Sequence, residues 1–405
     1  MLSLIRGEFV IFALTLIGVA FLHKHTMYVA LTGLLAVLIF KWFNVPDFSL
    51  FHHIIGGNGH EGEWRTLLNL LGLLLGFAIL AKHFEMSHIP EKIPHFLPDG
   101  KIGAFTLLVL IFVLSSFLDN IAAAMIGGTI AAVVFKHKIH VGYLAAIVAA
   151  SNAGGSGSVV GDTTTTLMWI DGVSPIDVVH AYVAALGAFL FFGIVASYQQ
   201  DKHHPIAKDT MTKKPIQWVR VFIVCIILGL TILTNWLLDF PALGVWIAIF
   251  IGAFLCKTPW SELKNAWQGT VFLVSLVICA SLMPVESLPA ASSHTTLGLG
   301  FVSAIFDNIP LTKLCLVQGG YDWGVLAYAV GFGGSMIWFG SSAGVALSNA
   351  FPQAKNTGAY LKNGWHVVVA YILGFALLMG TLGWNPHPPH KKKINETQIE
   401  QTRVP

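Results

Sequence analysis

Residues 151–166 read Ser-Asn-Ala-Gly-Gly-Ser-Gly-Ser-Val-Val-Gly-Asp-Thr-Thr-Thr-Thr, and this stretch decides how the chain around it folds. Apolar residues flank it on both sides, at 144–150 and at 167–170. Four glycines and three serines interrupt the helical pattern, because glycine is unfavourable within a helix and serine competes for backbone hydrogen bonds. We therefore expect a helix over about 141–169 that is broken in its middle and carries the carboxylate of Asp162 at the break.

The composition places this broken helix in a membrane. Of the 405 residues, 55% are hydrophobic and 11% are charged, with a mean hydropathy of +0.72. A soluble domain carries roughly 25% charged residues, and no soluble shape hides so much apolar surface. The net charge of +3 comes without a basic stripe, which argues against a nucleic-acid partner. The four cysteines have no paired spacing and predict neither disulfides nor a metal cluster.

Three landmarks recur in the same order in the two halves of the chain. Phe-Leu-Asp-Asn-Ile at 117–121 matches Ile-Phe-Asp-Asn-Ile at 305–309, and the pattern GGSxxxxG occurs at 154–161 and at 333–340. A histidine follows in each half, His180 and His366. Internal repetition of this kind is typical of secondary transporters.

The repeats predict an all-α polytopic membrane protein with two inverted repeats. Each repeat would have about five transmembrane helices, one re-entrant hairpin and discontinuous helices. The first repeat covers 1–200, with its hairpin at about 103–135 and its broken helix at about 141–169. The second covers 218–385, with its hairpin at about 297–317 and its broken helix at about 324–351. A linker at 201–217 joins the repeats, and a polar tail occupies 386–405.

The basic residues predict the orientation. If the Asp-Asn segments are hairpins that enter and leave on one side, fifteen of the 23 Lys and Arg residues fall on the side of the 201–217 linker. Seven fall on the opposite side, four of them in the tail, and Lys313 lies within a hairpin. By the positive-inside rule the linker is cytoplasmic, and a bacterial inner membrane is the expected location.

The Asp-Asn pairs at the hairpin tips are the first candidate ion site. Asp119 and Asn120 form one pair, and Asp307 and Asn308 form the other. Each aspartate could simply cap a helix. A carboxylate within a membrane is costly, however, so a functional role in binding a cation or a proton is the default hypothesis.

The two broken helices supply further candidates. Irregular backbone at membrane depth is tolerated only where it lines a cavity or is buried in protein, and its carbonyl groups suit a dehydrated cation. Close packing of small residues is the alternative, but it leaves Asp162 unexplained. With the hairpin pairs, the expected ion or substrate ligands are Asn152, Gly154, Gly155, Ser156, Asp162, Thr163, Thr164, Gly333, Gly334, Ser335, Ser341 and Ser342. Sodium is expected to bind through Asp119, Asn120, Asp162 and Thr163.

Three further residues are candidates for proton or charge transfer. His180 and His366 titrate near physiological pH, although a histidine in a helix is more often a hydrogen-bonding residue. Lys313 either pairs with an acidic group or contacts an anionic substrate.

The Asp-Asn hairpins and the run from Ser151 through Thr165 resemble the ion transporter superfamily. Within it, Gly-Asp-Thr-Thr-Thr-Thr-Leu-Met-Trp at 161–169 is most similar to NhaD-type sodium/proton antiporters. The superfamily also contains citrate, dicarboxylate and arsenite carriers. Dicarboxylate carriers usually have Ser-Asn-Thr where Asp119, Asn120 and Ile121 stand here. The resemblance implies two inverted repeats, a scaffold domain and a moving transport domain.

We therefore expect a secondary transporter that exchanges sodium for protons by alternating access. The main alternative is a cation-coupled carrier of an organic anion such as citrate or a dicarboxylate. An intramembrane aspartyl protease would need Gly-x-Gly-Asp, and Val159 interrupts that motif, so no enzyme is expected. Sodium and protons are the expected small-ion partners, with the lipid bilayer around them and no cofactor. The oligomeric state stays open, and a homodimer is one option.

Overall fold

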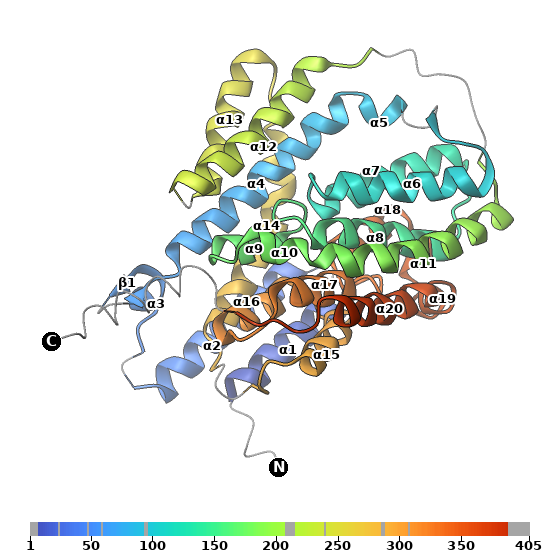
Figure 1. The fold of residues 1–405 in the computed structure, drawn as a ribbon. Helices are drawn as coiled ribbons and strands as arrows, with labels where there is room; N and C mark the ends of the chain where they lie inside the picture. The colour runs from blue at the N-terminus through green and yellow to red at the C-terminus, as the bar shows by residue number, and fades with distance from the viewer. Residues whose placement is uncertain are drawn as a thin grey trace. The chain divides into compact units, whose positions relative to one another are not determined.

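A computed structural model describes residues 7–22, 25–46, 48–57, 60–92, 96–206, 215–238, 240–284, 288–306 and 308–387. These residues are largely helical, as Figure 1 shows. Two strands of two residues each, β1 (Gly56–Gly57) and β2 (His60–Glu61), pair antiparallel. The chain divides into two compact units, and each has its own packing.

Several helices are suited to a lipid bilayer. Among the described residues, five are long and apolar enough to cross it: Thr26–Asn44, Trp64–Met86, Pro175–His203, Trp218–Leu238 and Ser261–Ser281. A sixth span results if Thr357–Asn363 and Trp365–Thr381, which bend by 56° at their junction, count as one. Five more apolar helices have 10–17 residues, fewer than the ~20 that a perpendicular span needs. The chain is therefore an all-helical polytopic membrane protein, which confirms the predicted fold class at this level.

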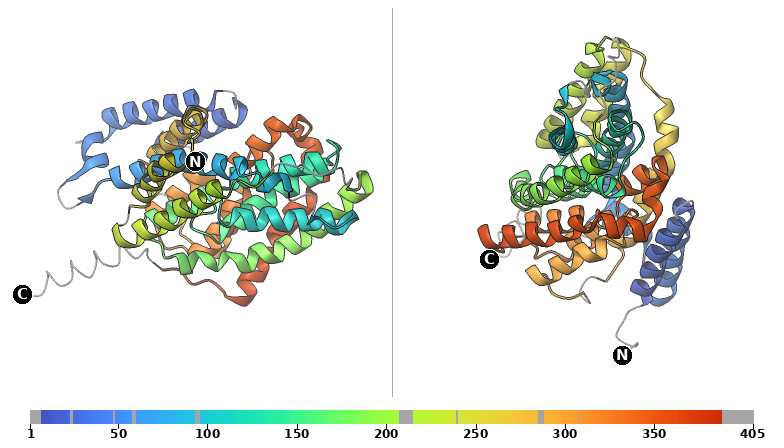
Figure 2. Two further views of the ribbon diagram at one scale, coloured as in Figure 1. Left: turned by 90° about the horizontal axis from the view of Figure 1, so that it is seen from above. Right: turned by 90° about the vertical axis from the view of Figure 1, so that its right-hand side faces the viewer.

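The first unit comprises 1–82, 222–288 and 309–318. Its elements are β1, β2, α1 (Gly7–Phe21), α2 (Thr26–Asn44), α3 (Leu50–Ile55), most of α4 (Trp64–Met86), most of α12 (Trp218–Leu238), α13 (Pro241–Leu255), α14 (Ser261–Ser281) and α16 (Asn308–Gln318) except its first residue. The blue pair α1 and α2 lies antiparallel in Figure 2, and α14 packs against α2.

Small residues bring α4 and α13 close together within the first unit. A Cβ at Gly72 would lie 2.7 Å from the Ala242 Cβ, and one at Gly76 would overlap Val245. The Trp246 indole Nε1 donates to the Gly72 carbonyl at 3.1 Å. Close approach of backbones through small residues is the usual basis of helix packing in membranes.

The second unit comprises 83–221, 289–308 and 319–405. Its helices are α5 (Ile89–Lys92), α6 (Gly100–Ser115), α7 (Asn120–Val134), α8 (Val141–Ser156), α9 (Thr163–Ile170), α10 (Pro175–Val179), α11 (Ala181–His203), α15 (Ser293–Ser303), α17 (Trp323–Gly333), α18 (Ser342–Ala350), η4 (Pro352–Lys355), α19 (Thr357–Asn363) and α20 (Trp365–Thr381).

Helix α8 forms the centre of the second unit. It packs against α6, α7, α11, α17 and α18, and every residue from Gly142 to Ser156 is buried. The helices α6, α8, α11, α17 and α20 lie side by side in Figure 1. Helix α8 can be surrounded in this way because it is apolar on all sides and rich in alanine and glycine.

At each of the two predicted glycine-rich stretches, one helix of this unit ends and the next one begins. Helix α8 ends at Ser156 and α9 begins at Thr163, and α17 ends at Gly333 and α18 begins at Ser342. Part of the predicted linker, at 207–214, and most of the predicted tail, at 388–405, lie outside the described residues.

Candidate ion-binding site

Two aspartates begin helices in the interior of the second unit. Asp119 precedes α7, and its Oδ2 accepts a hydrogen bond from the Ile121 amide at 3.1 Å. Asp162 precedes α9, and its Oδ1 accepts one from the Thr164 amide at 3.2 Å. Each carboxylate thus satisfies a backbone donor at the positive end of a helix dipole. Capping alone would leave the two helix starts independent of each other.

Neutral side chains join the two carboxylates instead. The Thr163 hydroxyl donates to Asp119 Oδ1 at 3.3 Å, so the first residue of α9 contacts the cap of α7. In return, the Asn120 amide nitrogen donates to Asp162 Oδ1 at 3.2 Å. The structure therefore brings together the four residues that were predicted to hold sodium.

Asn152 connects these residues with the second glycine-rich break. The side chain is fully buried, and its Oδ1 accepts a hydrogen bond from the Asn120 Nδ2 at 3.0 Å. Its own Nδ2 donates to the Ser335 hydroxyl at 2.9 Å and to the Ser341 hydroxyl at 3.1 Å. Ser341 caps α18 in the place where Asp162 caps α9.

The second Asp-Asn pair also reaches this network. Asn308 is buried, and its Nδ2 donates to the Thr164 hydroxyl at 3.1 Å. Asp307, which was predicted to be an ion ligand, lies outside the described residues. Ser342 is the first residue of α18. The Ser156 hydroxyl donates within its own helix to the Ala153 carbonyl at 2.8 Å, so it serves α8 and not the carboxylates.

The four predicted glycines contribute close backbone contacts. A Cβ at Gly154 would overlap the Phe112 carbonyl, and one at Gly333 would overlap the Gly300 carbonyl. A Cβ at Gly155 would lie 2.6 Å from the Gly161 carbonyl oxygen. In the same way, one at Gly334 would lie 2.7 Å from the Gly340 carbonyl oxygen. Because these glycines have no side chain, the broken stretches can approach the neighbouring backbone closely.

Lys313 lies in the first unit and has an acidic partner. It is 2% exposed, and its Nζ donates to Glu63 Oε2 at 2.9 Å. Sequence reasoning named the lysine but missed Glu63, because a polar loop residue 250 positions earlier gives no local signal of the pairing.

The two histidines are not joined to the carboxylates by any hydrogen bond among the described residues. His180 is exposed at the junction of α10 and α11, whereas His366 is fully buried near the start of α20 and lies edge-on to Trp365. Their predicted role in proton transfer stays a prediction.

A histidine that sequence reasoning read only as part of the tail lies outside the spans. His387 Nε2 lies 2.7 Å from Asp177 Oδ2, and its carbonyl accepts from the Trp323 indole at 2.7 Å. Burial lowers the pKa of His387, but the hydrogen bonds with Asp177 and the Asn385 carbonyl and the nearby charge of Asp322 outweigh burial and raise it above its usual range. The cluster ties the segment after α20 to α10 and α17.

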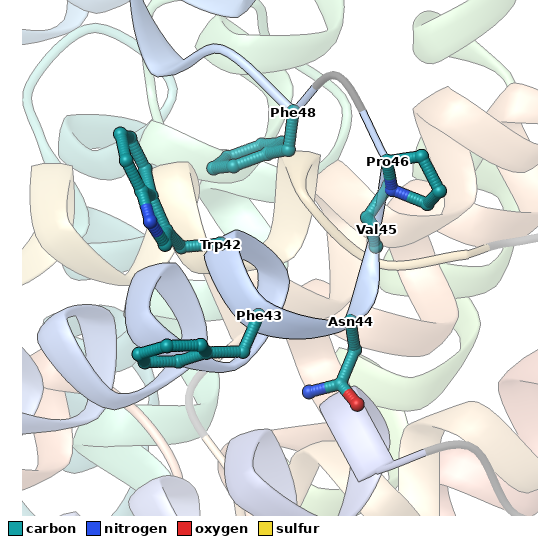
Figure 3. A pocket seen from close by; sticks show the side chains of 6 residues that line it. All are labelled: Trp42, Phe43, Asn44, Val45, Pro46 and Phe48. Carbon is teal, nitrogen blue, oxygen red and sulfur yellow. The ribbon is translucent and has the colours of Figure 1, made fainter.

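Figure 3 shows a pocket at the end of α2 in the first unit. Its lining comprises Trp42, Phe43, Asn44, Val45, Pro46 and Phe48. The Lys41 Nζ lies 5.6 Å from the Phe48 ring centroid. Exposed aromatic rings beside a lysine at a helix end are typical of a membrane–water interface. Among the described residues, the lining has no carboxylate that could hold a cation.

The polar groups of the second unit suit a small cation. The atoms brought together are carboxylate, amide and hydroxyl oxygens at the ends of broken helices, and hard cations prefer oxygen ligands. Helix breaks that meet around carboxylates within a multi-pass membrane protein are a feature of ion-binding sites in secondary transporters.

Comparison with known proteins leads to one family. No known family profile matches the chain. The chain is 27% identical to sodium/proton antiporter 1 of Arabidopsis thaliana over 69% of its own length, and it spans 55% of that relative. It is 26% identical to the Na(+)/H(+) antiporter NhaD of Alkalimonas amylolytica over 66% of its length and 67% of the relative. NhaD of Vibrio parahaemolyticus is also 26% identical, over 66% of this chain and 77% of its own. The chain is thus a relative of the NhaD-type antiporters, which confirms the resemblance.

Proposed function

We propose that the chain is a sodium/proton antiporter that works by alternating access. The observation that carries the proposal is the reciprocal linkage of Asp119 and Asp162 through Thr163 and Asn120. The linkage gathers the buried carboxylate of Asp162 and the half-buried one of Asp119 in one polar site, where sodium and protons compete. The names of the relatives support the same exchange.

Competition at the carboxylates is sufficient to couple the two ions. Two like charges in a site of low permittivity disfavour each other, so binding of a cation or of a proton relieves the same repulsion. On one side of the membrane sodium displaces the proton, and on the other side a proton displaces sodium. No cofactor takes part in this cycle.

We further propose that the two halves are inverted repeats. Asp162 and Ser341 cap corresponding helices. A Cβ at Gly154 or at Gly333 would overlap a backbone carbonyl group of a corresponding helix. Ser115 and Ser303 likewise donate to the corresponding carbonyls of Ser151 and Val330. Helices α6 and α7 would form the re-entrant hairpin of the first repeat. The linker at 201–217 would face the cytoplasm of a bacterial cell.

The alternative is a carrier of organic anions. Such a substrate needs a cationic group, and Lys313, which sequence reasoning offered for this role, is held by Glu63. Asp162 Oδ1 accepts hydrogen bonds from the Asn120 side-chain amide and the Thr164 backbone amide. The site chemistry and the names of the relatives both favour cation exchange and a transporter, not an enzyme.

Purified protein in vesicles with an internal pH dye tests the proposal. Sodium or lithium added outside should dissipate an imposed proton gradient, whereas potassium and citrate should not. Sodium-dependent uptake of labelled citrate, without sodium-driven proton movement, would contradict antiport and support the anion carrier.

A further inference from the structure

The start of helix α8 is held by the side chain of a histidine. His140 precedes α8, and its Nδ1 accepts a hydrogen bond from the Gly142 amide at 3.2 Å. The residues that usually cap a helix, serine, threonine, aspartate and asparagine, do not change their charge near neutral pH. A backbone N–H group can only donate, so His140 Nδ1 carries no proton in this arrangement. The imidazole is therefore neutral, with its proton on Nε2.

The side chain of Gln200 on α11 fixes the backbone around this histidine. Gln200 is fully buried, and its Oε1 accepts a hydrogen bond from the His140 amide at 2.7 Å. Its Nε2 donates to the Lys138 carbonyl at 3.1 Å and to the His204 carbonyl at 2.9 Å. The loop that carries His140 is thus tied to the end of α11.

The groups that face His140 are other histidines. His203, the last residue of α11, lies with its ring centroid 5.4 Å from that of His140. Among the described residues, the titratable groups whose charges act on His140 are His203 and His366 of α20, and no carboxylate is one of them. Burial and the neighbouring His203 lower the pKa of His140 below its ordinary value of 6.5.

Helix α8 connects His140 with the proposed ion site. Its side chains are buried from Gly142 to Ser156, and Asn152 lies about 18 Å along the helix from His140 at 1.5 Å per residue. Asn152 is the residue that joins Asn120 to the second glycine-rich break. A closely packed interior transmits strain, so a displacement at the start of α8 reaches the groups around Asn152.

We propose that His140 makes ion exchange sensitive to the pH on the side of the 201–217 linker. The neutral imidazole holds the start of α8. A proton on Nδ1 removes the acceptor of the Gly142 amide, places a positive charge at the positive end of the helix dipole and repels a protonated His203. Exchange then slows, because α8 no longer holds Asn152 in place. The inference rests on the proposed function and adds its regulation: His140 is a positioning residue and binds no transported sodium.

The lowered pKa of His140 gives the direction of the effect. The capped form of α8 is complete at pH values above 6.5, and it is lost as the pH falls through the lower pKa of the folded state. Protons that accumulate on the side of the linker therefore slow the exchange.

The test uses three substitutions. His140→Asn keeps a side-chain acceptor for the start of α8 but cannot be protonated. His203→Gln removes the neighbouring charge. His137→Asn is the matched control, because His137 is an exposed histidine of the same loop with a φ of 61°, a conformation that asparagine adopts more readily than most residues.

Exchange of labelled sodium into sodium-loaded vesicles is measured at a series of pH values, with the same pH on both sides. Saturating sodium limits the competition of protons for the carboxylates. The rate for the wild type should fall at acid pH. His140→Asn should move the midpoint of this fall to lower pH, and His203→Gln should move it to higher pH by up to about half a unit. His137→Asn should match the wild type.

Opposite shifts distinguish titration of His140 from a merely structural role, which would change the rate at every pH. A midpoint that stays unchanged in His140→Asn overturns the inference. If His140→Asn fails to fold, a midpoint that His203→Gln leaves unchanged or moves to lower pH overturns it.

The unfolding midpoint of the purified proteins separates this inference from the proposed antiport. As the pH falls below 6.5, the wild type should lose stability relative to His140→Asn, whether or not the protein transports ions. The absence of this difference overturns the inference. Its presence in a protein that exchanges sodium but moves no protons contradicts only the proposed antiport.

Discussion

At the scale of single residues, the proposed ion-binding role of Asp162 makes a demand that its observed role as a helix cap does not. As the cap of α9 it needs only an oxygen that accepts from Thr164, which asparagine also provides. As an ion ligand it needs its charge. Replacement of Asp162 by asparagine keeps one accepting oxygen but removes the charge. It therefore separates the role as a cap from the proposed role as an ion ligand.

We expect Asp162→Asn to insert and fold normally but to lose sodium-dependent proton movement by about 10- to 100-fold, since a charged ligand contributes about 1.5–3 kcal/mol. Proton flux in vesicles measures the effect. Asp171→Asn, at the other end of α9, is the matched control. Full exchange at the normal apparent sodium affinity in Asp162→Asn would show that Asp162 is only a cap.

Sequence reasoning went furthest where the signal was local. The glycines and the aspartate at 154–162 predicted a broken helix, and the structure has α8 end and α9 begin there. The sequence could not predict which polar groups meet. Asn152 reaches Ser341, and Gly331 faces Asp162, through the packing of α8 on α17 and α18, which no local pattern encodes.

At the scale of elements, α16 depends on a pair of charges. Lys313 is almost completely buried, whereas the side chain of Glu63 is 22% exposed. Removal of one partner from a buried pair leaves the other without compensation, and the cost depends on how well water reaches the remaining charge. The two halves of the pair are therefore not equivalent.

We expect Glu63→Gln to destabilise the protein by about 3–5 kcal/mol, because the buried ammonium group of Lys313 loses the carboxylate that lies 2.9 Å from it. Lys313→Gln should cost only about 1 kcal/mol, because Glu63 retains access to water. Heating followed by size-exclusion chromatography in detergent gives the order of stability. The double variant Glu63→Gln/Lys313→Gln should recover most of the loss, and half-buried Glu262 and exposed Lys264 of α14 provide control substitutions. A Lys313→Gln variant less stable than Glu63→Gln would contradict this account.

At the scale of the whole molecule, the raised pKa of His387 predicts how stability varies with pH. The ion pair with Asp177 contributes fully below the ordinary histidine pKa of 6.5 and is lost as the pH rises through the higher pKa of the folded state. Because the imidazole is partly exposed, the effect is small. We expect His387→Gln to lower the unfolding midpoint by about 1–2 °C at pH 5.5 and not at pH 8.5. An equal effect at both pH values would exclude the ion pair.

Orientation is testable at the two ends of one long span, Pro175–His203. In a variant without the four native cysteines, Lys202→Cys should react only with membrane-permeant thiol reagents in intact cells. Ile176→Cys, at the opposite end, should react with impermeant reagents as well. The expectation rests on the excess of basic residues on the side of the linker. Labelling of Lys202→Cys by an impermeant reagent would invert the proposed topology.

The hydrogen bonds of Asn152 also determine when, during synthesis of the chain, the network around it can be completed. Its partners Ser335 and Ser341 follow it by 183 and 189 residues. A ribosome that adds about 5–20 residues per second therefore needs on the order of 10 to 40 seconds to deliver them. During that interval the nascent first half holds an incomplete site, and the centre of the molecule is finished almost last. A chain whose synthesis stops before Ser335 thus lacks both hydroxyl partners of Asn152, and the proposed site stays incomplete.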